Sequence, residues 1–235
     1  MTAAPTRALS EAADLELSAY REEYVRGRVL RALDREGVAH EAALATLLAD
    51  DAEARSRFRR SVAISVSGLF RDPAQFDVLE QELLPPLVAD GRRLRVWSAG
   101  CADGSELYSV AVVLDRLGAL ERSSLLGSDL LEENLAVARA GVFGQTAFDA
   151  RMRARLRWER RDLVRDGTAP GPWSLILCRN LAIYLAPDAK DRLHERLAAS
   201  LAPGGVLLLG RAERLARPGE LRLERAGPHA YRRPL

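Results

Sequence analysis

The stretch Leu94–Ser109, LRVWSAGCADGSELYS, constrains the fold more than any other part of the chain. It opens on a short apolar run, Leu94 to Trp97, that is typical of a buried strand. Gly100 and Gly104 then interrupt the pattern, and helical spacing follows from Glu106 to Leu117. A strand that turns through glycines into a helix places unpaired N–H groups and the positive end of the helix dipole beside the turn. The G-x-x-x-G spacing matches neither the G-x-G-x-x-G dinucleotide motif nor a P-loop, so a cofactor loop and a plain turn both remain open.

Apolar runs and helical spacings alternate along the rest of the chain, and this alternation favours an open, mostly parallel sheet. A hairpin is expected at the end of the chain, within residues 221–233 and about Gly227-Pro228. The other expected strands are residues 125–127, 156–160, 173–177 and 206–209, and the expected helices are residues 73–89, 132–140 and 187–201.

Polar or glycine positions follow the expected strands, at Gly100, Asp129, Asp162 and Asn180. Ligands of open parallel sheets bind beyond the carboxyl ends of the strands. An acidic residue at the end of the second strand, here Asp129, is where ribose hydroxyls are held in nucleotide-binding sheets. The four positions therefore predict one ligand site at one edge of the sheet.

The first part of the chain has a different pattern. Residues 1–14 lack periodicity and are expected to be irregular, whereas helices are expected over residues 15–33, 41–48 and 52–65, with Gly37 ending the first. Arg28, Arg31 and Arg35 share one helical face. That face is either a solvated charged surface or a docking surface for an acidic partner helix.

The connection between the two parts carries Ser65, Ser67 and Arg71, and then Asp72-Pro73 as the expected N-cap and first residue of a helix. It is either a capped loop between domains or a segment whose hydroxyls and arginine reach the ligand site. Arg71 would suit a carboxylate, because a guanidinium donates two parallel hydrogen bonds.

Composition narrows the class of protein. The 235 residues carry a net charge of +2 and no basic-aromatic stripe, so a nucleic-acid partner is not expected. No apolar run is long enough to span a membrane, and the start has no signal-peptide core, so a cytoplasmic protein is expected. The two cysteines give no disulfide framework, and the three histidines lie far apart, so no metal site is expected.

Motifs in a fixed order give the chain a resemblance to the CheR family of chemotaxis receptor methyltransferases, from about Tyr20 to Arg232. The resemblance implies a class I, Rossmann-like α/β domain that binds S-adenosylmethionine, over residues 71–235, after a small all-α domain and linker over residues 1–70. The motifs are SVSGLFRDPAQF, RVWSAGCADGSELYSVA, SDLLEENLAVARAGVF, DLV, LILCRNLAIYL, LAPGGVLLLGRAERL and AYRR.

The resemblance also implies roles for single residues. Arg71 would meet the methionine carboxylate of the cofactor and Tyr184 would orient the substrate, and these two are the expected catalytic residues. Asp129 would hold the ribose, and Asp162 with Leu163 would lie beside the adenine. The remaining cofactor-binding positions are Ser65, Ser67, Gly100, Glu106, Arg179 and Asn180.

The implied activity is O-methylation of glutamate side chains in the cytoplasmic helical region of a chemoreceptor, by a monomeric enzyme that uses S-adenosylmethionine and no metal. Several positions depart from the family pattern: Ser105, Leu107 and Leu131 replace family residues, and Pro85-Pro86 stands where some members have a substrate-side arginine. The chain is also shorter than the family between Gly141 and Leu156, where a β-subdomain is expected to be missing. Two alternatives therefore remain: a methyltransferase for a small molecule, and a diverged member that binds the cofactor but acts on another acceptor or as a non-catalytic regulator.

Overall fold

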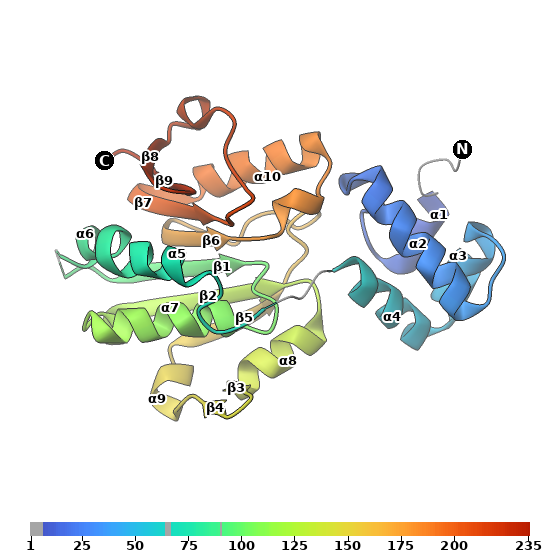
Figure 1. Ribbon diagram of the computed structural model, residues 1–235, viewed down its shortest axis with the longest axis horizontal. Coiled ribbons are helices and arrows are strands. Elements are labelled where there is room, and N and C mark those ends of the chain that lie inside the picture. Colours follow the sequence, from blue (N-terminus) through green and yellow to red (C-terminus); the bar gives the residue numbers. More distant parts are fainter. Residues whose placement is uncertain (1–6, 64–66, 90) are drawn as a thin grey trace. The chain divides into compact units, whose positions relative to one another are not determined.

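The computed structural model describes residues 7–63, 67–89 and 91–235. The chain divides into two compact units (Figure 1). Unit 1 contains Met1–Ile64 and Ile183–Arg192, and unit 2 contains Ser65–Ala182 and Leu193–Leu235. A short segment from the second half of the sequence is thus grouped with the N-terminal helices. The expected domain boundary at residue 70 stays a prediction.

Unit 1 is helical, and its helices are more extensive than the sequence indicated. Residues 7–13, expected to be irregular, form helix α1, whose Leu9 and Ala13 are fully buried. The helix expected from residue 15 starts later, because Tyr20 is extended and forms an antiparallel bridge with Leu185. The elements are α1 (Arg7–Ala13), η1 (Leu17–Ala19), α2 (Glu22–Glu36), α3 (Glu41–Asp50) and α4 (Ala52–Val62).

Local chemistry sets the ends of these helices. Gly37 ends α2 in the left-handed region, at φ 67°, as predicted. His40 caps α3, because its Nδ1 accepts a hydrogen bond from the N–H of Ala43 at 3.2 Å. Asp51 caps α4 by accepting from the N–H groups of Glu53 and Ala54 at 2.8 and 3.1 Å.

A charged contact ties α2 to α4. Arg57 donates from Nε and Nη2 to the two carboxylate oxygens of Glu36, at 3.2 and 2.8 Å. Arg35 donates to the same carboxylate at 2.7 Å. These donors stabilise the ionised form, and they lower the pKa of Glu36 from its usual 4.5 to about 2, with Arg57 the larger cause. Arg35, part of the predicted basic face, is therefore already paired.

Unit 2 contains the predicted open sheet. Among the described residues, seven strands pair in the order β5-β2-β1-β6-β7-β9-β8, with parallel pairing from β5 through β7 and antiparallel pairing of β9 and β8. The order reverses at β1, which lies between β2 and β6, and this switch point opens a crevice beyond the strand ends. The strands are β1 (Leu94–Ala99), β2 (Ser123–Asp129), β5 (Leu156–Arg160), β6 (Trp173–Cys178), β7 (Leu201–Leu209), β8 (Glu224–Gly227) and β9 (Ala230–Arg232).

The last parallel strand begins earlier than predicted. β7 starts at Leu201 rather than Val206, because its pairing with β6 jumps from Trp173↔Leu201 to Leu175↔Val206. The extra residues bulge through Gly204 at φ 75° and Gly205, where a Cβ would come within 2.7 Å of the Trp173 carbonyl oxygen. Gly204 and Gly205 therefore lie in a bulge inside a strand.

One helix of unit 2 is interrupted. Pro85 lacks an N–H and its ring would clash with a preceding carbonyl, so the predicted helix 73–89 widens into a π turn before it. In that turn the N–H of Leu84 reaches the carbonyl of Leu79 at 2.9 Å. The connecting elements are α5 (Pro73–Val78), η2 (Leu79–Leu83, the π turn), α6 (Pro85–Val88), α7 (Ser105–Arg116), η3 (Leu120–Arg122), α8 (Glu132–Ala140), α9 (Ala150–Arg153), η4 (Ala182–Tyr184), α10 (Pro187–Ala199) and η5 (Pro218–Leu221).

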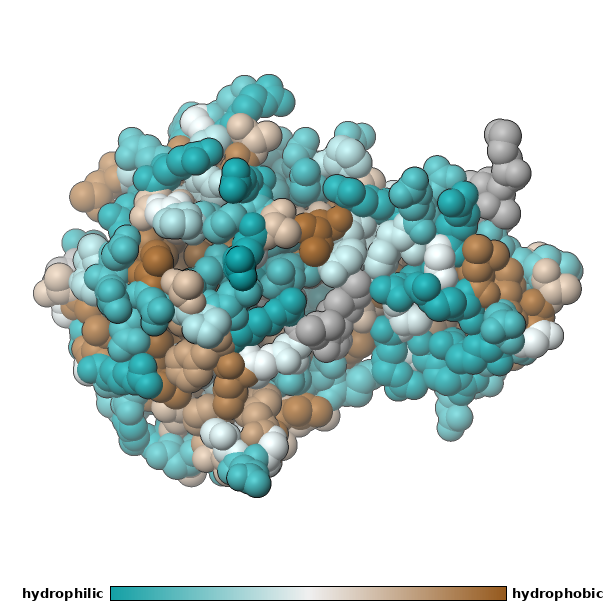
Figure 2. Space-filling view, viewed as in Figure 1, coloured by the Kyte–Doolittle hydropathy of each residue, from teal (hydrophilic) through white to brown (hydrophobic). Residues whose placement is uncertain are grey.

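The segment between α8 and β5 is short, as expected, but it contains regular secondary structure. It holds a hairpin of β3 (Val142–Phe143) and β4 (Thr146–Ala147), followed by α9. Phe148 stacks on Tyr108 of α7 with ring centres 4.5 Å apart. Val137 and Val142 are 44% and 51% exposed, and Figure 2 shows hydrophobic side chains among hydrophilic ones in this region. The hairpin therefore packs as a small cover on the aromatic end of α7.

The core of unit 2 lies between one face of the sheet and helices α5 to α7. Alternate strand residues, such as Val96, Leu175 and Val206, face Phe76 and Leu114 of these helices. No helix in the described part of the chain combines the length and apolar character that crossing a membrane requires.

The contact between Glu36 and Arg57 predicts a pH effect in unit 1. Because folding lowers the pKa of Glu36, the ion pair stabilises the fold above about pH 4.5, and this contribution is lost as the pH falls toward 2. Urea unfolding between pH 5 and pH 3 should therefore show a smaller loss of stability for Glu36→Gln than for the wild type. Glu53→Gln is the control, since Glu53 is 91% exposed and 3.8 Å from Arg57. Equal pH slopes for wild type and Glu36→Gln would contradict the assignment.

Candidate functional site

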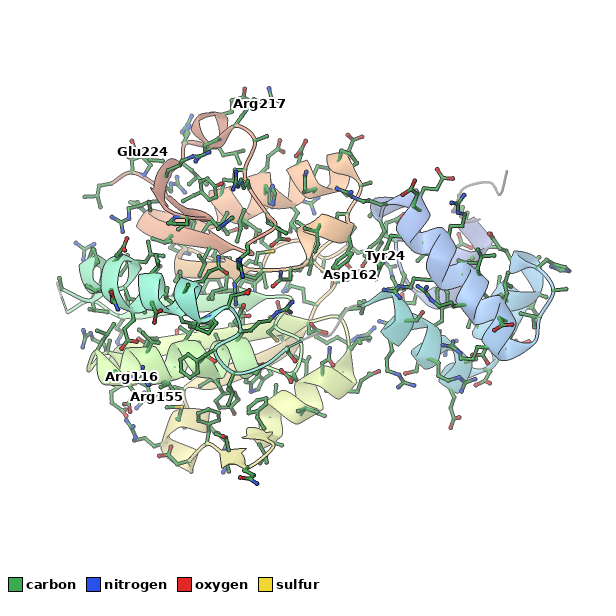
Figure 3. The ribbon with its side chains drawn as sticks, viewed as in Figure 1. Tyr24, Arg116, Arg155, Asp162, Arg217 and Glu224 are labelled. Carbon is green, nitrogen blue, oxygen red and sulfur yellow. The ribbon has the colours of Figure 1, made fainter. Side chains whose placement is uncertain are left out.

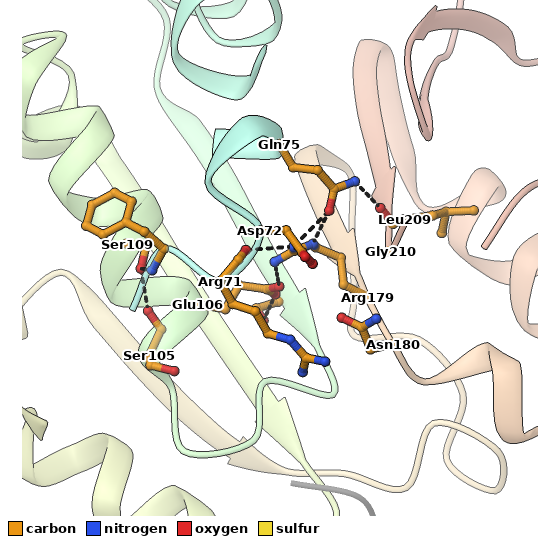
Figure 4. A network of polar contacts seen from close by, with 12 residues as sticks. Arg71, Asp72, Gln75, Ser105, Glu106, Ser109, Arg179, Asn180, Leu209 and Gly210 are labelled. Atoms are coloured by element: carbon orange, nitrogen blue, oxygen red, sulfur yellow. Dashed lines mark hydrogen bonds and ion pairs between the residues drawn. The ribbon is translucent and has the colours of Figure 1, made fainter. Parts of the chain in front are cut away.

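The carboxyl ends of β1, β2 and β6 converge at the switch point, and a buried arginine lies there. Arg179 directly follows β6, and its side chain is only 3% exposed (Figure 4). Its guanidinium donates five hydrogen bonds to four acceptor atoms, which lie at the start of α5, just before it, and in α7. These are Glu106 Oε2 at 2.9 Å, Asp72 Oδ2 at 3.0 Å, the Arg71 carbonyl at 2.9 Å, and Gln75 Oε1 at 3.0 Å from Nε and 2.8 Å from Nη2.

Glu106 and Asp72 balance this cation. Glu106, in the first turn of α7, also accepts from Ser98 Oγ of β1 at 2.7 Å. Asp72 is the N-cap residue of α5, at φ 61°, but its side chain makes no capping hydrogen bond. The predicted positions are confirmed, with Asp72 at the N-cap and Pro73 at the start of α5, but the Asp72 carboxylate binds Arg179 instead of the helix N–H groups. Two carboxylates against one guanidinium give this trio a net charge of −1.

Asp129 lies at the end of β2, as predicted, and holds the glycine loop. Its Oδ2 accepts from the N–H of Ala102 at 2.9 Å. Its Oδ1 accepts from the Leu131 N–H and from Asn134 Nδ2, both at 3.0 Å. Burial raises the pKa of Asp129, and these hydrogen bonds oppose that shift. Each carboxylate oxygen can accept two hydrogen bonds, so Oδ2 keeps the capacity for one more.

The backbone conformation and close neighbours of the two loop glycines leave no room for a side chain. Both have positive φ, 80° at Gly100 and 86° at Gly104. A Cβ on Gly100 would lie 2.6 Å from Leu181, and one on Gly104 would lie 2.6 Å from Trp158. The ring of Trp158 thus occupies the space beside Gly104.

Asn180 depends on a residue that sequence reasoning missed. Asn180 is in the left-handed region at φ 60°. Glu213, which follows β7 and is 4% exposed, accepts from the N–H of Asn180 at 2.7 Å, Leu181 at 3.1 Å and Gly210 at 2.8 Å. The buried carboxylate thus fixes the turn after β6. A signal was present in the sequence, since Glu213 is an acidic residue just beyond an apolar strand.

Asp162 and Leu163 lie in the loop after β5, where they were predicted (Asp162 is labelled in Figure 3). Asp162 Oδ1 accepts from the N–H of Val164 at 2.9 Å, while the Asp162 N–H donates to Asp166 at 2.9 Å. Burial raises the pKa of Asp162. Leu163 is buried.

The linker residues are only partly described. Ser65 lies outside the described residues, and Ser67 is half-buried. Arg71 contributes its backbone carbonyl to Arg179, as given above. Ser105, in the first turn of α7, is buried, and its Oγ has no hydrogen-bond partner in the described part of the chain. That unsatisfied hydroxyl fits a polar ligand at the start of α7.

Tyr184 belongs to unit 1 and is not grouped with the residues above. Its ring lies 5.0 Å from that of Tyr24, and its carbonyl accepts from the Arg21 N–H at 2.9 Å. Tyr24 (labelled in Figure 3) also stacks beneath Arg28, with the guanidinium 4.7 Å from the ring centre. The catalytic role expected for Tyr184 stays a prediction.

The cysteines of this region do not form a reactive pair. Cys101 and Cys178 are buried, and burial raises the pKa of both thiols well above the usual value. Within residues 7–63, 67–89 and 91–235, no group of His, Cys, Asp and Glu is arranged to hold a metal ion.

Arg179 and Arg211 allow a matched test of the network, because both contact Asp72. Arg179→Leu should lower the free energy of unfolding by about 3 kcal/mol, since it leaves two partly buried carboxylates without their cation. Arg211 is 73% exposed and 3.7 Å from Asp72, so Arg211→Leu should cost less than about 1 kcal/mol. Urea unfolding measures both values, and similar losses for the two variants would contradict the central role of Arg179.

Known proteins are similar to this chain in sequence. The family described as "CheR methyltransferase, SAM binding domain" matches residues 65–150 and 144–226. A chemotaxis protein methyltransferase of Listeria monocytogenes is 30% identical over 240 residues, covering 92% of this chain and 90% of that protein. Chemotaxis protein methyltransferase 1 of Vibrio cholerae is 32% identical over 205 residues, covering 73% and 74%.

Among solved structures, the S-adenosylmethionine-bound amino pentose methyltransferase CalS10 of Micromonospora echinaspora is 21% identical. It has a TM-score of 0.42 and covers 67% of this chain and 53% of that one. The family match spans the strand ends, the Arg179 network and Asp129. The chain therefore belongs to the CheR family of methyltransferases, and residues 65–226 carry that family's S-adenosylmethionine-binding domain.

Proposed function

We propose that this chain transfers the methyl group of S-adenosylmethionine to glutamate side chains in the cytoplasmic helical region of a chemoreceptor. The observation that carries the proposal is the CheR family match over residues 65–226, which includes every described polar residue of the switch-point crevice. The relatives in Listeria and Vibrio are named as chemotaxis protein methyltransferases, and this chain covers most of their length.

The described residues suit the cofactor group by group. Asp129 Oδ2 keeps an acceptor position for a ribose hydroxyl. Asp162 and Leu163 offer a polar and an apolar contact to the adenine. The net negative charge of Arg179, Glu106 and Asp72 suits the cationic amino acid part, with Glu106 as the acceptor for its ammonium group.

The amino acid part of the cofactor also carries a carboxylate. We assign Arg71 to bind this carboxylate, with Ser65 and Ser67 as further hydrogen-bond donors. Gly100 keeps the loop close to the ligand, and Asn180 lies after β6 beside Arg179. Ser105 replaces a family acid, and its unpartnered hydroxyl is available as one more donor.

The chemistry requires little from the protein beyond positioning. S-adenosylmethionine supplies an electrophilic methyl group on a sulfonium sulfur. A glutamate side chain, with a reference pKa of about 4.3, is already the nucleophile at neutral pH, so no general base is needed. As the oxygen–carbon bond forms, the sulfur–carbon bond breaks and its electron pair stays on sulfur, which leaves a methyl ester and a neutral thioether. We assign Tyr184 to donate a hydrogen bond to one carboxylate oxygen, so that the other is held in line with the methyl group.

The ribose assignment is tested by binding of S-adenosylhomocysteine. Asp129→Ala should weaken binding at least tenfold in calorimetric titration, because a hydrogen bond to a charged acceptor is worth about 1.5–3 kcal/mol. Asp115→Ala is the matched control, since Asp115 is a surface carboxylate paired with Arg151. An unchanged isotherm for a folded Asp129→Ala protein would place the ribose elsewhere.

Methyl transfer itself is tested with labelled S-adenosylmethionine and a receptor cytoplasmic fragment. We expect label on the fragment that mild alkali releases as methanol, because methyl esters hydrolyse in base and N-methyl groups do not. Substituting Gln for the accepting glutamates should abolish labelling. Tyr184→Phe should keep the affinity for S-adenosylhomocysteine and lower turnover at least tenfold.

Tight binding of S-adenosylhomocysteine without ester formation on any receptor fragment would favour the second candidate, a family member that binds the cofactor without methylating receptors. The short β3–β4 hairpin, in place of a larger segment, is the observation that keeps this candidate open.

A further inference from the structure

A second polar cavity lies at the C-terminal hairpin, apart from the residues of the switch-point crevice. Its volume is about 140 Å³. It is lined by Arg214, Arg225, Gly227, Pro228, His229 and Tyr231. These residues come from the segment after β7 and from the two strands and the turn of the β8–β9 hairpin (Figure 1). None of them was assigned a role by the sequence motifs or by the proposed activity.

The two arginines of this cavity have unused donors. Within the described residues, the side chains of Arg214 and Arg225 make no hydrogen bond or ion pair, whereas most arginines of the chain do. Arg225 pairs in register with Tyr231, so these two side chains share one face of the hairpin. Glu224 (labelled in Figure 3) is the adjacent residue and points to the other face, so it does not neutralise Arg225 within the cavity.

The walls of the cavity are held by hydrogen bonds. The carbonyl of Glu213 accepts from His229 Nδ1 at 2.9 Å, which places the hydrogen on that nitrogen because a carbonyl cannot donate. Tyr231 is buried, and its hydroxyl oxygen accepts from the Leu215 N–H at 3.1 Å. Glu213 does not line the cavity, and three backbone N–H groups donate to its carboxylate. The cavity therefore combines fixed walls with an excess of positive charge.

We propose that this cavity binds a phosphate group carried by a small phosphorylated molecule. Two guanidinium groups offer more parallel N–H donors than the two oxygens of one carboxylate can use, and they match the three oxygens and near-divalent charge of a phosphate monoester. The volume agrees with this ligand, since a cavity of about 150 Å³ accommodates a benzene molecule. It is too small to enclose a whole nucleotide, so the rest of a larger ligand would extend into solvent.

The test is a titration of the full chain with glycerol phosphate and with inorganic phosphate, at constant ionic strength set with chloride. Binding is followed by the ³¹P chemical shift and by the rise in thermal midpoint. We expect millimolar or tighter binding of both phosphates by the wild type. Arg214→Gln combined with Arg225→Gln should weaken that binding at least tenfold.

The control is Arg217→Gln combined with Arg222→Gln, which removes the same charge from the same segment but no residue that lines the cavity. It should change the affinity less than twofold, and both double variants should keep the wild-type midpoint in chloride. Equal losses in the two double variants, or no binding by the wild type, would overturn the site. Tighter binding of succinate than of glycerol phosphate would overturn the assignment of the ligand.

Discussion

The guanidinium of Arg179 holds together three parts of the chain that are far apart in sequence: the start of α5, the first turn of α7 and the end of β6. Its hydrogen bonds to Asp72, Gln75 and Glu106 all lie between 2.8 and 3.0 Å. A lysine could not replace it, because an ammonium group has three donors and no planar fork. The crevice at the switch point therefore depends on one buried cation, the Arg179 guanidinium, which is paired with two carboxylates.

A second buried charge fixes the other side of the same turn. Three backbone N–H groups, those of Asn180, Leu181 and Gly210, donate to the carboxylate of Glu213 and stabilise it. Arg179 and Asn180 are adjacent in sequence, yet Arg179 is held by elements that precede it and Asn180 by an element that follows it. The turn after β6 is thus held by residues that precede it in the sequence and by a residue that follows it.

Much of this arrangement could be predicted from the sequence, because it depends on local pattern. Short apolar runs located the strands, and the polar residue after each run located Asp129, Asp162 and Asn180 at one edge. The rest depended on partners that no local pattern specifies. Asp72 occupies the predicted N-cap position, but its carboxylate binds Arg179, and Gly104 is required by the nearby ring of Trp158.

In the helical unit, too, some features could be predicted from the sequence and others could not. The left-handed end at Gly37 could be predicted, since glycine favours that conformation. The late start of α2 could not, because it follows from the pairing of Tyr20 with Leu185, more than half the chain away. Helix α1 was missed for a similar reason: its few apolar residues form a helix because they are buried against other helices, and isolated short helices are marginal in water.

The position of Glu213 near the end of the chain has a consequence for biosynthesis. Residues that form the motifs of the crevice, from Gly100 to Asn180, leave the ribosome well before Glu213 does. During that interval the turn after β6 lacks the acceptor for its N–H groups, while β7 lacks its antiparallel neighbour β9. Since domains fold as units as they are synthesised, the nascent chain carries the residues of the crevice before it has the Glu213 carboxylate and β9, and a chain that stops after β7 would lack both.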